Sequence, residues 1–135
     1  MKKDLLRIID ANLNRSREGL RVCEEITRFV LEDKKLTEEL KRLRHGISRS
    51  VKKFPAMSKG LLECRCVISD VGRKISNKSG RKHYKDIFSA NIQRVKESLR
   101  VLEEFSKILN RTLSNNFARL RFKAYELEKK IIARL

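Results

Sequence analysis

The chain has 135 residues, of which 40% are hydrophobic and 38% charged, and its formal net charge is +17. This length suits one domain with a hydrophobic core, predicted over residues 1–135, and the composition is typical of long helices. No apolar run approaches a membrane span and no signal-peptide cleavage pattern is present, so we expect a cytoplasmic protein. The three cysteines, two of them in a C-x-C, fall short of a four-ligand zinc set.

Apolar residues recur at helical spacing in four segments, which predicts an all-α fold. The four segments are residues 5–30, 36–54, 88–109 and 113–131. Pro55 is expected to end the second helix, because proline cannot continue the helical hydrogen-bond ladder. Short joints at residues 32–35 and 110–116 fold the helices into two antiparallel hairpins. Because one hairpin alone leaves an apolar face uncovered, the two are predicted to pack as a pseudo-symmetric four-helix bundle.

The first and third helices carry the same motif. "ANLNRSREGLRVCEE" at residues 11–25 returns as "ANIQRVKESLRVLEE" at residues 90–104, and the helix after each copy also matches. The chain therefore divides into repeat one (residues 5–55), a connection (residues 56–86) and repeat two (residues 87–135).

Polar residues interrupt the apolar face in both copies of the motif. At about 100° per residue, Asn12, Arg15 and Gly19 fall inside the apolar arc of the first helix. The matching positions in the third helix are Asn91, Arg94 and Ser98. Burying Asn and Arg costs several kcal/mol unless each finds polar partners. Gly19 loses about 1 kcal/mol of helix propensity relative to alanine and is expected to open space beside the arginine.

Two interpretations fit these residues, and the sequence leaves both open. In the first, buried Asn–Arg networks that include Glu18 and Glu97 fix how the two hairpins dock. In the second, the two asparagines and two arginines of the repeated motif converge on an anion in a pocket between helices. The planar guanidinium group suits phosphate oxygens, which favours an anion of that kind.

The connection at residues 56–86 shows no apolar periodicity and contains three of the five glycines. An aperiodic stretch of this length in a compact domain is often functional, and a disordered basic linker is the alternative. "GRKISNKS" at residues 72–79 approaches a Walker A loop, but Asn77 replaces the second glycine and no parallel sheet is predicted around it. A P-loop is therefore not expected, and Lys78 and Arg81 are candidates only for loop cations that touch phosphate.

The positive charge is distributed over most of the chain. Residues 1–33 carry as many acidic as basic side chains, and the excess lies along residues 34–135 without forming a tail. This distribution predicts a folded surface that meets anions, whether nucleic acid, nucleotide or phosphorylated metabolite. A solvated lysine-rich surface without a specific partner is the alternative.

The repeated motif and three further segments resemble a known family. The matching segments are "ANLNRSREGLRVCE", "LRH" at residues 43–45, "CRCVISDVG" at 64–72, "ANIQRVKESLRVLEE" and "LRFKAYELE" at 120–128. Over nearly the whole chain they are similar to the small helical domain that is fused in front of thiamine-phosphate synthase in many bacteria and also occurs alone. The loop of that family reads Arg-Asp before its D-V-G, whereas Cys66 follows Arg65 here. Leu135 lies where a fused synthase domain would begin, so a stand-alone form or an excised domain is expected.

The resemblance implies an enzyme of thiamine biosynthesis, a hydroxymethylpyrimidine phosphate kinase. Such an enzyme transfers a phosphoryl group from ATP to 4-amino-5-hydroxymethyl-2-methylpyrimidine phosphate and so forms the diphosphate. The expected ligands are then ATP, Mg²⁺ and the phosphorylated pyrimidine. Thiamine-phosphate synthase is a candidate protein partner.

The matched motifs also imply which residues form the site. Asp70 is predicted to be the catalytic residue, where it holds Mg²⁺ or orients the acceptor oxygen, and Gly72 gives the backbone beside it an anion-binding geometry. The substrate- and phosphate-binding residues are predicted to be Asn12, Arg15, Arg44, Arg65, Gly72, Asn91 and Arg94. Glu24 and Glu103 are reserve metal ligands or, as the alternative, ordinary charged helix residues.

Two other functions stay open beside the kinase. A basic helical module that binds nucleic acid accords with the net charge, but the chain has no Trp and only two Tyr to stack on bases. A non-catalytic regulatory domain would bind the phosphorylated pyrimidine without converting it.

Overall fold

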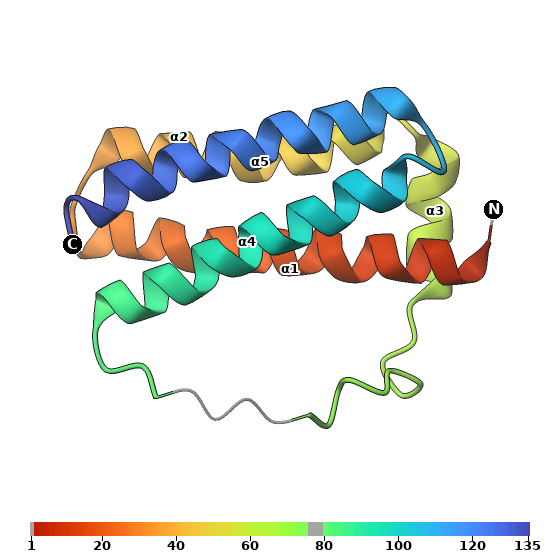
Figure 1. Cartoon of the computed structure of the whole chain (residues 1–135), viewed down its shortest axis with the longest axis horizontal. Coiled ribbons are helices and arrows are strands. Elements are labelled where there is room, and N and C mark those ends of the chain that lie inside the picture. The colour runs from red at the N-terminus through yellow and green to blue at the C-terminus, as the bar shows by residue number, and fades with distance from the viewer. Residues whose placement is uncertain (1, 76–79) are drawn as a thin grey trace.

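The computed structural model describes residues 2–75 and 80–135, and in these residues the chain is all-α. Its helices are α1 (Lys3–Phe29), α2 (Lys34–Lys52), α3 (Pro55–Cys64), α4 (Tyr84–Ser106) and α5 (Arg111–Ile132) (Figure 1). The predicted all-α fold is confirmed, with one helix more than the apolar spacing indicated.

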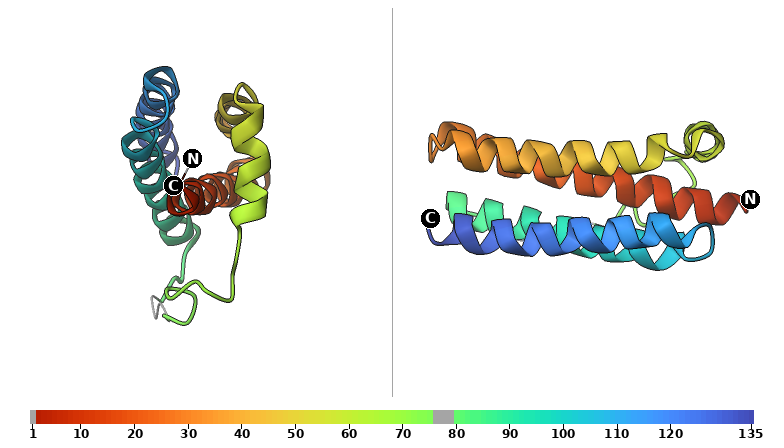
Figure 2. Two further views of the ribbon diagram at one scale, coloured as in Figure 1. Left: turned by 90° about the vertical axis from the view of Figure 1, so that its right-hand side faces the viewer. Right: turned by 90° about the horizontal axis from the view of Figure 1, so that it is seen from above.

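The four long helices form two hairpins, α1–α2 and α4–α5, that lie against each other as two layers (Figure 2). The contacts between the layers run mainly from α1 to α4 and from α2 to α5. The paired helices α1 and α4 run in opposite directions, and α3 lies across one end of the α1–α2 hairpin (Figure 1). This is the predicted pseudo-symmetric bundle, in which each hairpin covers the apolar face of the other.

The core consists of the apolar stripes that the sequence predicts. Its largest side chains, each at most 1% exposed, are Ile9, Leu13, Leu20, Leu40, Ile47, Phe88, Ile92, Leu99, Leu102, Leu113, Phe117 and Leu127. Val30, which the first stripe included, is 40% exposed, because α1 ends at Phe29 and Val30 is its C-cap residue. Within the described ranges, no helix combines the length and the apolar character that a membrane crossing requires.

The turns within the two hairpins use the same kind of helix cap. Asp33 Oδ1 accepts a hydrogen bond from the Leu36 amide at 2.9 Å, and Asn110 Oδ1 accepts one from the Leu113 amide at 3.1 Å. Such a side chain satisfies an amide of the first helical turn and so sets where α2 and α5 begin. The joint predicted at residues 110–116 is wrong for this reason, since α5 already begins at Arg111.

The connection predicted at residues 56–86 begins with a helix, which corrects the prediction that the whole stretch is irregular. Pro55 occupies the first turn of α3, where its missing amide proton is not needed. Met57 and Leu61, one turn apart, are 2% and 6% exposed and join the core. Two apolar residues at a spacing of four make too short a stripe to stand out in the sequence.

Gly19 lets α1 and α4 approach each other closely. A Cβ atom at this position would lie 2.8 Å from Val95 Cγ2 and 3.0 Å from the backbone oxygen of Asn91. Both distances are shorter than ordinary contacts, so a side chain at this position would push the helices apart. The expectation that Gly19 opens space beside Arg15 is therefore wrong, because α4 fills that space.

Gly19→Ala is expected to lower the free energy of unfolding by about 1–2 kcal/mol, although alanine by itself favours a helix by about 1 kcal/mol. The backbone of α4 cannot move away without disturbing the packing between the hairpins. Gly46→Ala is a matched control, since its Cβ would meet Leu120 Cδ2 at 3.0 Å and Arg49 Nη2 at 3.9 Å, both at the ends of side chains that can rotate. Urea unfolding should show no loss for this control, and equal losses in both variants would contradict the explanation.

Candidate functional site

A cleft of about 920 Å³ opens between α1, α4 and the chain that follows α3. Six of the residues predicted for the site line it, namely Asn12, Arg15, Arg65, Asp70, Gly72 and Arg94. Arg7 and Arg73 add positive charge, and Asp4, Asp10 and Glu18 add carboxylates. Two predicted residues, Arg44 and Asn91, do not line it. The structure therefore brings together most of the predicted residues from three separate segments of the chain.

The repeated asparagine is anchored to its own helix in the same way in both copies. Asn12 Nδ2 donates to the backbone oxygen of Ile8, and Asn91 Nδ2 donates to that of Ile87, each at 2.8 Å. In the first copy, Asn12 Oδ1 also accepts a hydrogen bond from Arg15 Nη1 at 3.4 Å. The Asn12 amide thus links the helix backbone to the guanidinium group at the cleft.

Arg15 and Arg94 are exposed, which argues against the first of the two interpretations, in which they lie in buried networks. Within the described residues, Glu18 is exposed and forms no ion pair with Arg15, and Glu97 accepts a hydrogen bond from Gln93. Both arginines line the cleft, Arg15 from α1 and Arg94 from α4. Both guanidinium groups are therefore accessible to an anion in the cleft.

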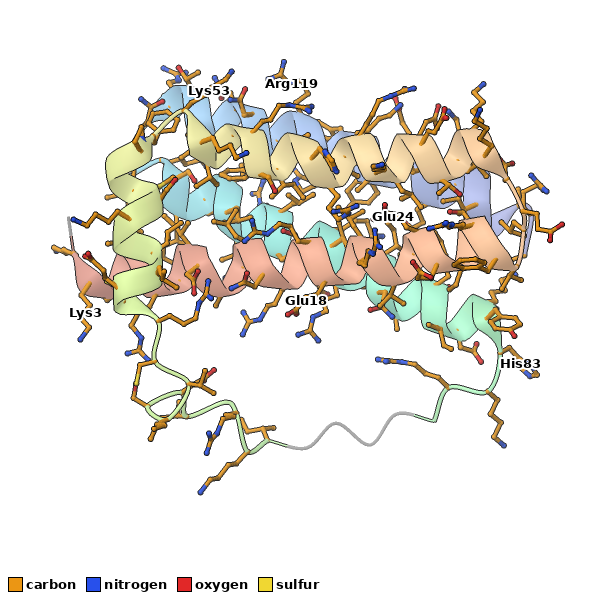
Figure 3. The ribbon with its side chains drawn as sticks, turned by 180° about the vertical axis from the view of Figure 1, so that it is seen from behind. Lys3, Glu18, Glu24, Lys53, His83 and Arg119 are labelled. Atoms are coloured by element: carbon orange, nitrogen blue, oxygen red, sulfur yellow. The ribbon has the colours of Figure 1, made fainter. Side chains whose placement is uncertain are left out.

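Arg44 lies in an ion pair within the first hairpin. Its Nε and Nη2 donate to the two carboxylate oxygens of Glu24 at 2.6 Å and 3.1 Å. Figure 3 shows Glu24 on the side of α1 that faces α2 and Glu18 on the opposite side. Repeat two has the equivalent pair, in which Arg121 Nε donates to Glu103 at 2.9 Å. The structure thus uses this duplicated pair to join the two helices of each hairpin.

Arg65 is held at the cleft by a carboxylate that the sequence analysis missed. Asp10, which is 5% exposed, accepts from Arg65 Nε at 2.8 Å and from Arg65 Nη2 at 2.7 Å. These hydrogen bonds and the charge of Asp10 raise the pKa of Arg65. Asp10 accepts from Nε and Nη2 only, so other N–H groups of the Arg65 guanidinium remain to donate to a ligand. The one sequence signal for Asp10 is its difference from the second copy, which has Ser89 at this position.

The chain after Arg65 forms a turn that presents Asp70 at the cleft. Asp70 Oδ1 accepts a hydrogen bond from the Gly72 amide at 2.9 Å, as in an Asx turn. Arg7 Nη2 donates to Ser69 Oγ at 3.1 Å and so ties the turn to α1. The Gly72 amide is used inside the turn, so the Asp70 carboxylate is the group that remains for a ligand.

The carboxylates of the cleft do not form a metal site by themselves. In the part of the chain that the structure describes, no three His, Cys, Asp or Glu side chains lie close enough together to hold a metal ion. Mg²⁺ commonly binds through one or two carboxylates together with substrate phosphates. Asp70, exposed at the cleft, fits that second mode.

Of the predicted loop cations, only Arg81 lies in the described residues. It is exposed and does not line the cleft. Lys78, together with the end of the Walker-like stretch at residues 72–79, lies outside the described residues.

The three cysteines are expected to differ in reactivity. Burial raises the pKa of Cys23 to about 12, whereas hydrogen bonds from Ser69 lower the pKa of Cys66, which is exposed at the cleft. A lower pKa gives more thiolate at neutral pH, and the thiolate is the reactive form. Iodoacetamide should therefore modify Cys66 first and Cys23 last, as followed by mass spectrometry, and Ser69→Ala should slow Cys66. Rapid modification of Cys23 in the folded protein would contradict its place in the core.

The sequence matches a protein family and several known proteins along almost its whole length. The sequence profile of the ThiD2 family matches residues 7–130. A protein of Synechocystis sp. named thiamine-phosphate synthase is 38% identical over 130 residues, which cover 95% of this chain and 36% of that protein. The protein of the same name from Thermosynechococcus vestitus is 39% identical over 127 residues, with 93% and 34% covered.

A third protein of that name, from Rhodopirellula baltica, is 34% identical over 135 residues, which cover 96% of this chain and 36% of that protein. The chain thus spans about a third of the length of the curated relatives it matches. No solved structure matches it.

Proposed function

The chain belongs to the ThiD2 family, a family of thiamine biosynthesis, and on this basis we propose that it is a hydroxymethylpyrimidine phosphate kinase. In this reaction a phosphate oxygen of 4-amino-5-hydroxymethyl-2-methylpyrimidine phosphate attacks the γ-phosphorus of ATP, the bond to the β–γ bridging oxygen breaks, and ADP leaves. The observation that supports the proposal is the cleft, where Arg15, Arg65 and Arg94 converge from three segments of the chain.

Both substrates are anions, so bringing them together requires positive charge and fixed positions more than covalent chemistry from the protein. Guanidinium groups bind phosphate oxygens through paired hydrogen bonds. Arg15 and Arg94 would bind phosphate oxygens of the two substrates, and Arg65, oriented by Asp10, would bind a further one. The attacking oxygen of a phosphate ester is largely ionised at neutral pH, because the second pKa of such a group is about 6. The chain therefore need not supply a strong base.

Asp70 is the residue that would hold Mg²⁺. Its Oδ1 already accepts from the Gly72 amide, which fixes the orientation of the carboxylate, and this carboxylate would hold the ion together with substrate phosphates. When bound, Mg²⁺ supplies charge neutralisation at the transferred phosphoryl group.

The proposal is tested by measuring ADP release from the purified chain with ATP, Mg²⁺ and the phosphorylated pyrimidine. We expect release that depends on the phosphorylated pyrimidine, with the diphosphate product identified by ³¹P NMR. The unphosphorylated pyrimidine is the matched control and should release no ADP. Binding of the phosphorylated pyrimidine without ADP release would instead indicate a regulatory domain. DNA binding that weakens steeply with salt, without metabolite binding, would indicate a nucleic-acid module.

A further inference from the structure

One end of the cleft is lined by apolar residues of α1 and α4, and one of them differs between the two copies of the repeat. α1 and α4 run in opposite directions (Figure 1). Gly19 of α1 lies against Val95 of α4. The C-terminal half of α4 therefore lies beside the N-terminal half of α1. For this reason Val101 and Phe105 of α4 line the cleft together with Ile8 of α1.

Phe105 is where the repeat departs from its own pattern at this end. Val101 has the same residue, Val22, at the equivalent position of repeat one, but the equivalent of Phe105 is Ile26. Ile26 is 5% exposed and belongs to the core. Phe105 is only partly buried, packs against the core on one side and lines the cleft on the other. Repeat two thus has an aromatic ring at the cleft where repeat one has an aliphatic core residue.

Phe105 is also the only aromatic side chain among the described residues that line the cleft. It lies one turn from Val101 on α4, so the two side chains share one helical face and form an apolar strip. Ile8 and Ala11 are the other apolar residues of the lining, and the remainder is polar or charged, apart from Val67 and Cys66 on the chain after α3. A surface of this kind suits a flat ring that carries polar substituents.

The spacing along α4 separates this apolar strip from the repeated arginine. Arg94 and Phe105 are 11 residues apart on α4, which is about 16 Å along the helix axis. Arg94 and Phe105 therefore lie at different places along the cleft. Arg65, which is held by Asp10 two residues from Ile8, is the arginine on the side of Phe105, where a ring and its own phosphate group can be bound together.

We infer that Phe105 is the platform on which the flat heterocyclic ring of a phosphorylated ligand stacks, and that it is a specificity-determining residue of the cleft. The identity of the ligands rests on the proposed function. The phosphorylated pyrimidine and ATP both carry an aminated heterocyclic ring, and only one of the two rings can lie on a single phenyl face. The protein binds the substrate whose ring stacks on Phe105 more weakly when the phenyl group is removed.

The test is Phe105→Leu, which keeps an apolar side chain and removes the aromatic face. We expect the KM of one substrate to rise about tenfold, since stacking of a base on an aromatic side chain is worth about that much, while the KM of the other stays within about twofold. Phe105→Tyr should restore the wild-type value. Phe122→Leu is the matched control, because Phe122 is 59% exposed on α5 and does not line the cleft.

Direct binding measurements separate this inference from the proposed function. Titration calorimetry with the phosphorylated pyrimidine, ATP and ribose 5-phosphate, which has no heterocyclic ring, should show that Phe105→Leu weakens one ring-bearing ligand and leaves ribose 5-phosphate unchanged. Wild-type protein that binds these ligands without ADP release would overturn the kinase and still allow this comparison. Equal changes for both ring-bearing ligands, or no change for either, would overturn the inference.

Discussion

Arg44→Met is expected to lower the free energy of unfolding by about 3–5 kcal/mol, because it leaves the Glu24 carboxylate buried without its main partner. The Glu24 side chain is 4% exposed and accepts both of its short hydrogen bonds from Arg44. Its remaining cation, Arg21, lies 3.8 Å away and is 57% exposed, so it compensates little. Urea unfolding followed by circular dichroism measures the loss.

Arg42→Met is the matched control for this prediction, since Arg42 lies two positions earlier on α2 and is exposed. Its effect should stay within about 0.5 kcal/mol. The double change Glu24→Leu with Arg44→Met should recover most of the stability, because replacing both members of a buried ion pair by apolar residues is often neutral. If Arg44→Met is no worse than Arg42→Met, the Glu24 carboxylate is not dependent on this pair.

Arg15→Met is expected to reduce the rate of ADP release by about a hundredfold or more, because it removes a guanidinium group that would stabilise charge on the transferred phosphoryl group. The free energy of unfolding should change by no more than about 0.5 kcal/mol, since Arg15 is exposed and its side chain makes one hydrogen bond within the described residues, the 3.4 Å bond to Asn12. Initial rates and urea unfolding on the same preparation measure both quantities.

Arg42→Met again provides the comparison, with the same loss of charge away from the cleft, and it should retain wild-type activity. A variant of Arg15 that unfolds early and still turns over at the wild-type rate would show that the arginine is structural. That result would support the first interpretation of the repeated motif, in which Arg15 belongs to a network that fixes how the two hairpins dock.

Most of the fold could be predicted because apolar residues recur at helical spacing over several turns of each long helix. The stripe of α4 is an example, since Phe88, Ile92, Val95, Leu99 and Leu102 recur at helical spacing and are all 0% exposed. α3 could not be predicted in the same way, because it buries one pair of residues one turn apart. The start of α5 was misplaced because a polar run reads as a joint until the cap at Asn110 is known.

The identity of most site residues could be predicted from the sequence, but the burial and the partners of their side chains could not. A helical wheel gives the angle of Arg15 on α1, but it does not show whether the neighbouring helices cover the Arg15 side chain. Arg15 and Arg44 look equally available in the sequence, and only the fold shows that Arg44 is paired with Glu24. The contact between Asp10 and Arg65 joins residues 55 positions apart, which no local pattern encodes.

The length of the connection between α3 and α4 follows from the direction of the helices. α4 begins at the opposite end of the bundle from α3, so the chain must travel back along the bundle before the second hairpin starts (Figure 1). The 23 residues of α4 are about 34 Å long, a distance that takes at least ten extended residues to cover. A chain with a shorter connection could make the same contacts between α1 and α4 only by exchanging its second hairpin with another copy. The long connection is thus what allows one chain to close its own bundle rather than form an intertwined dimer.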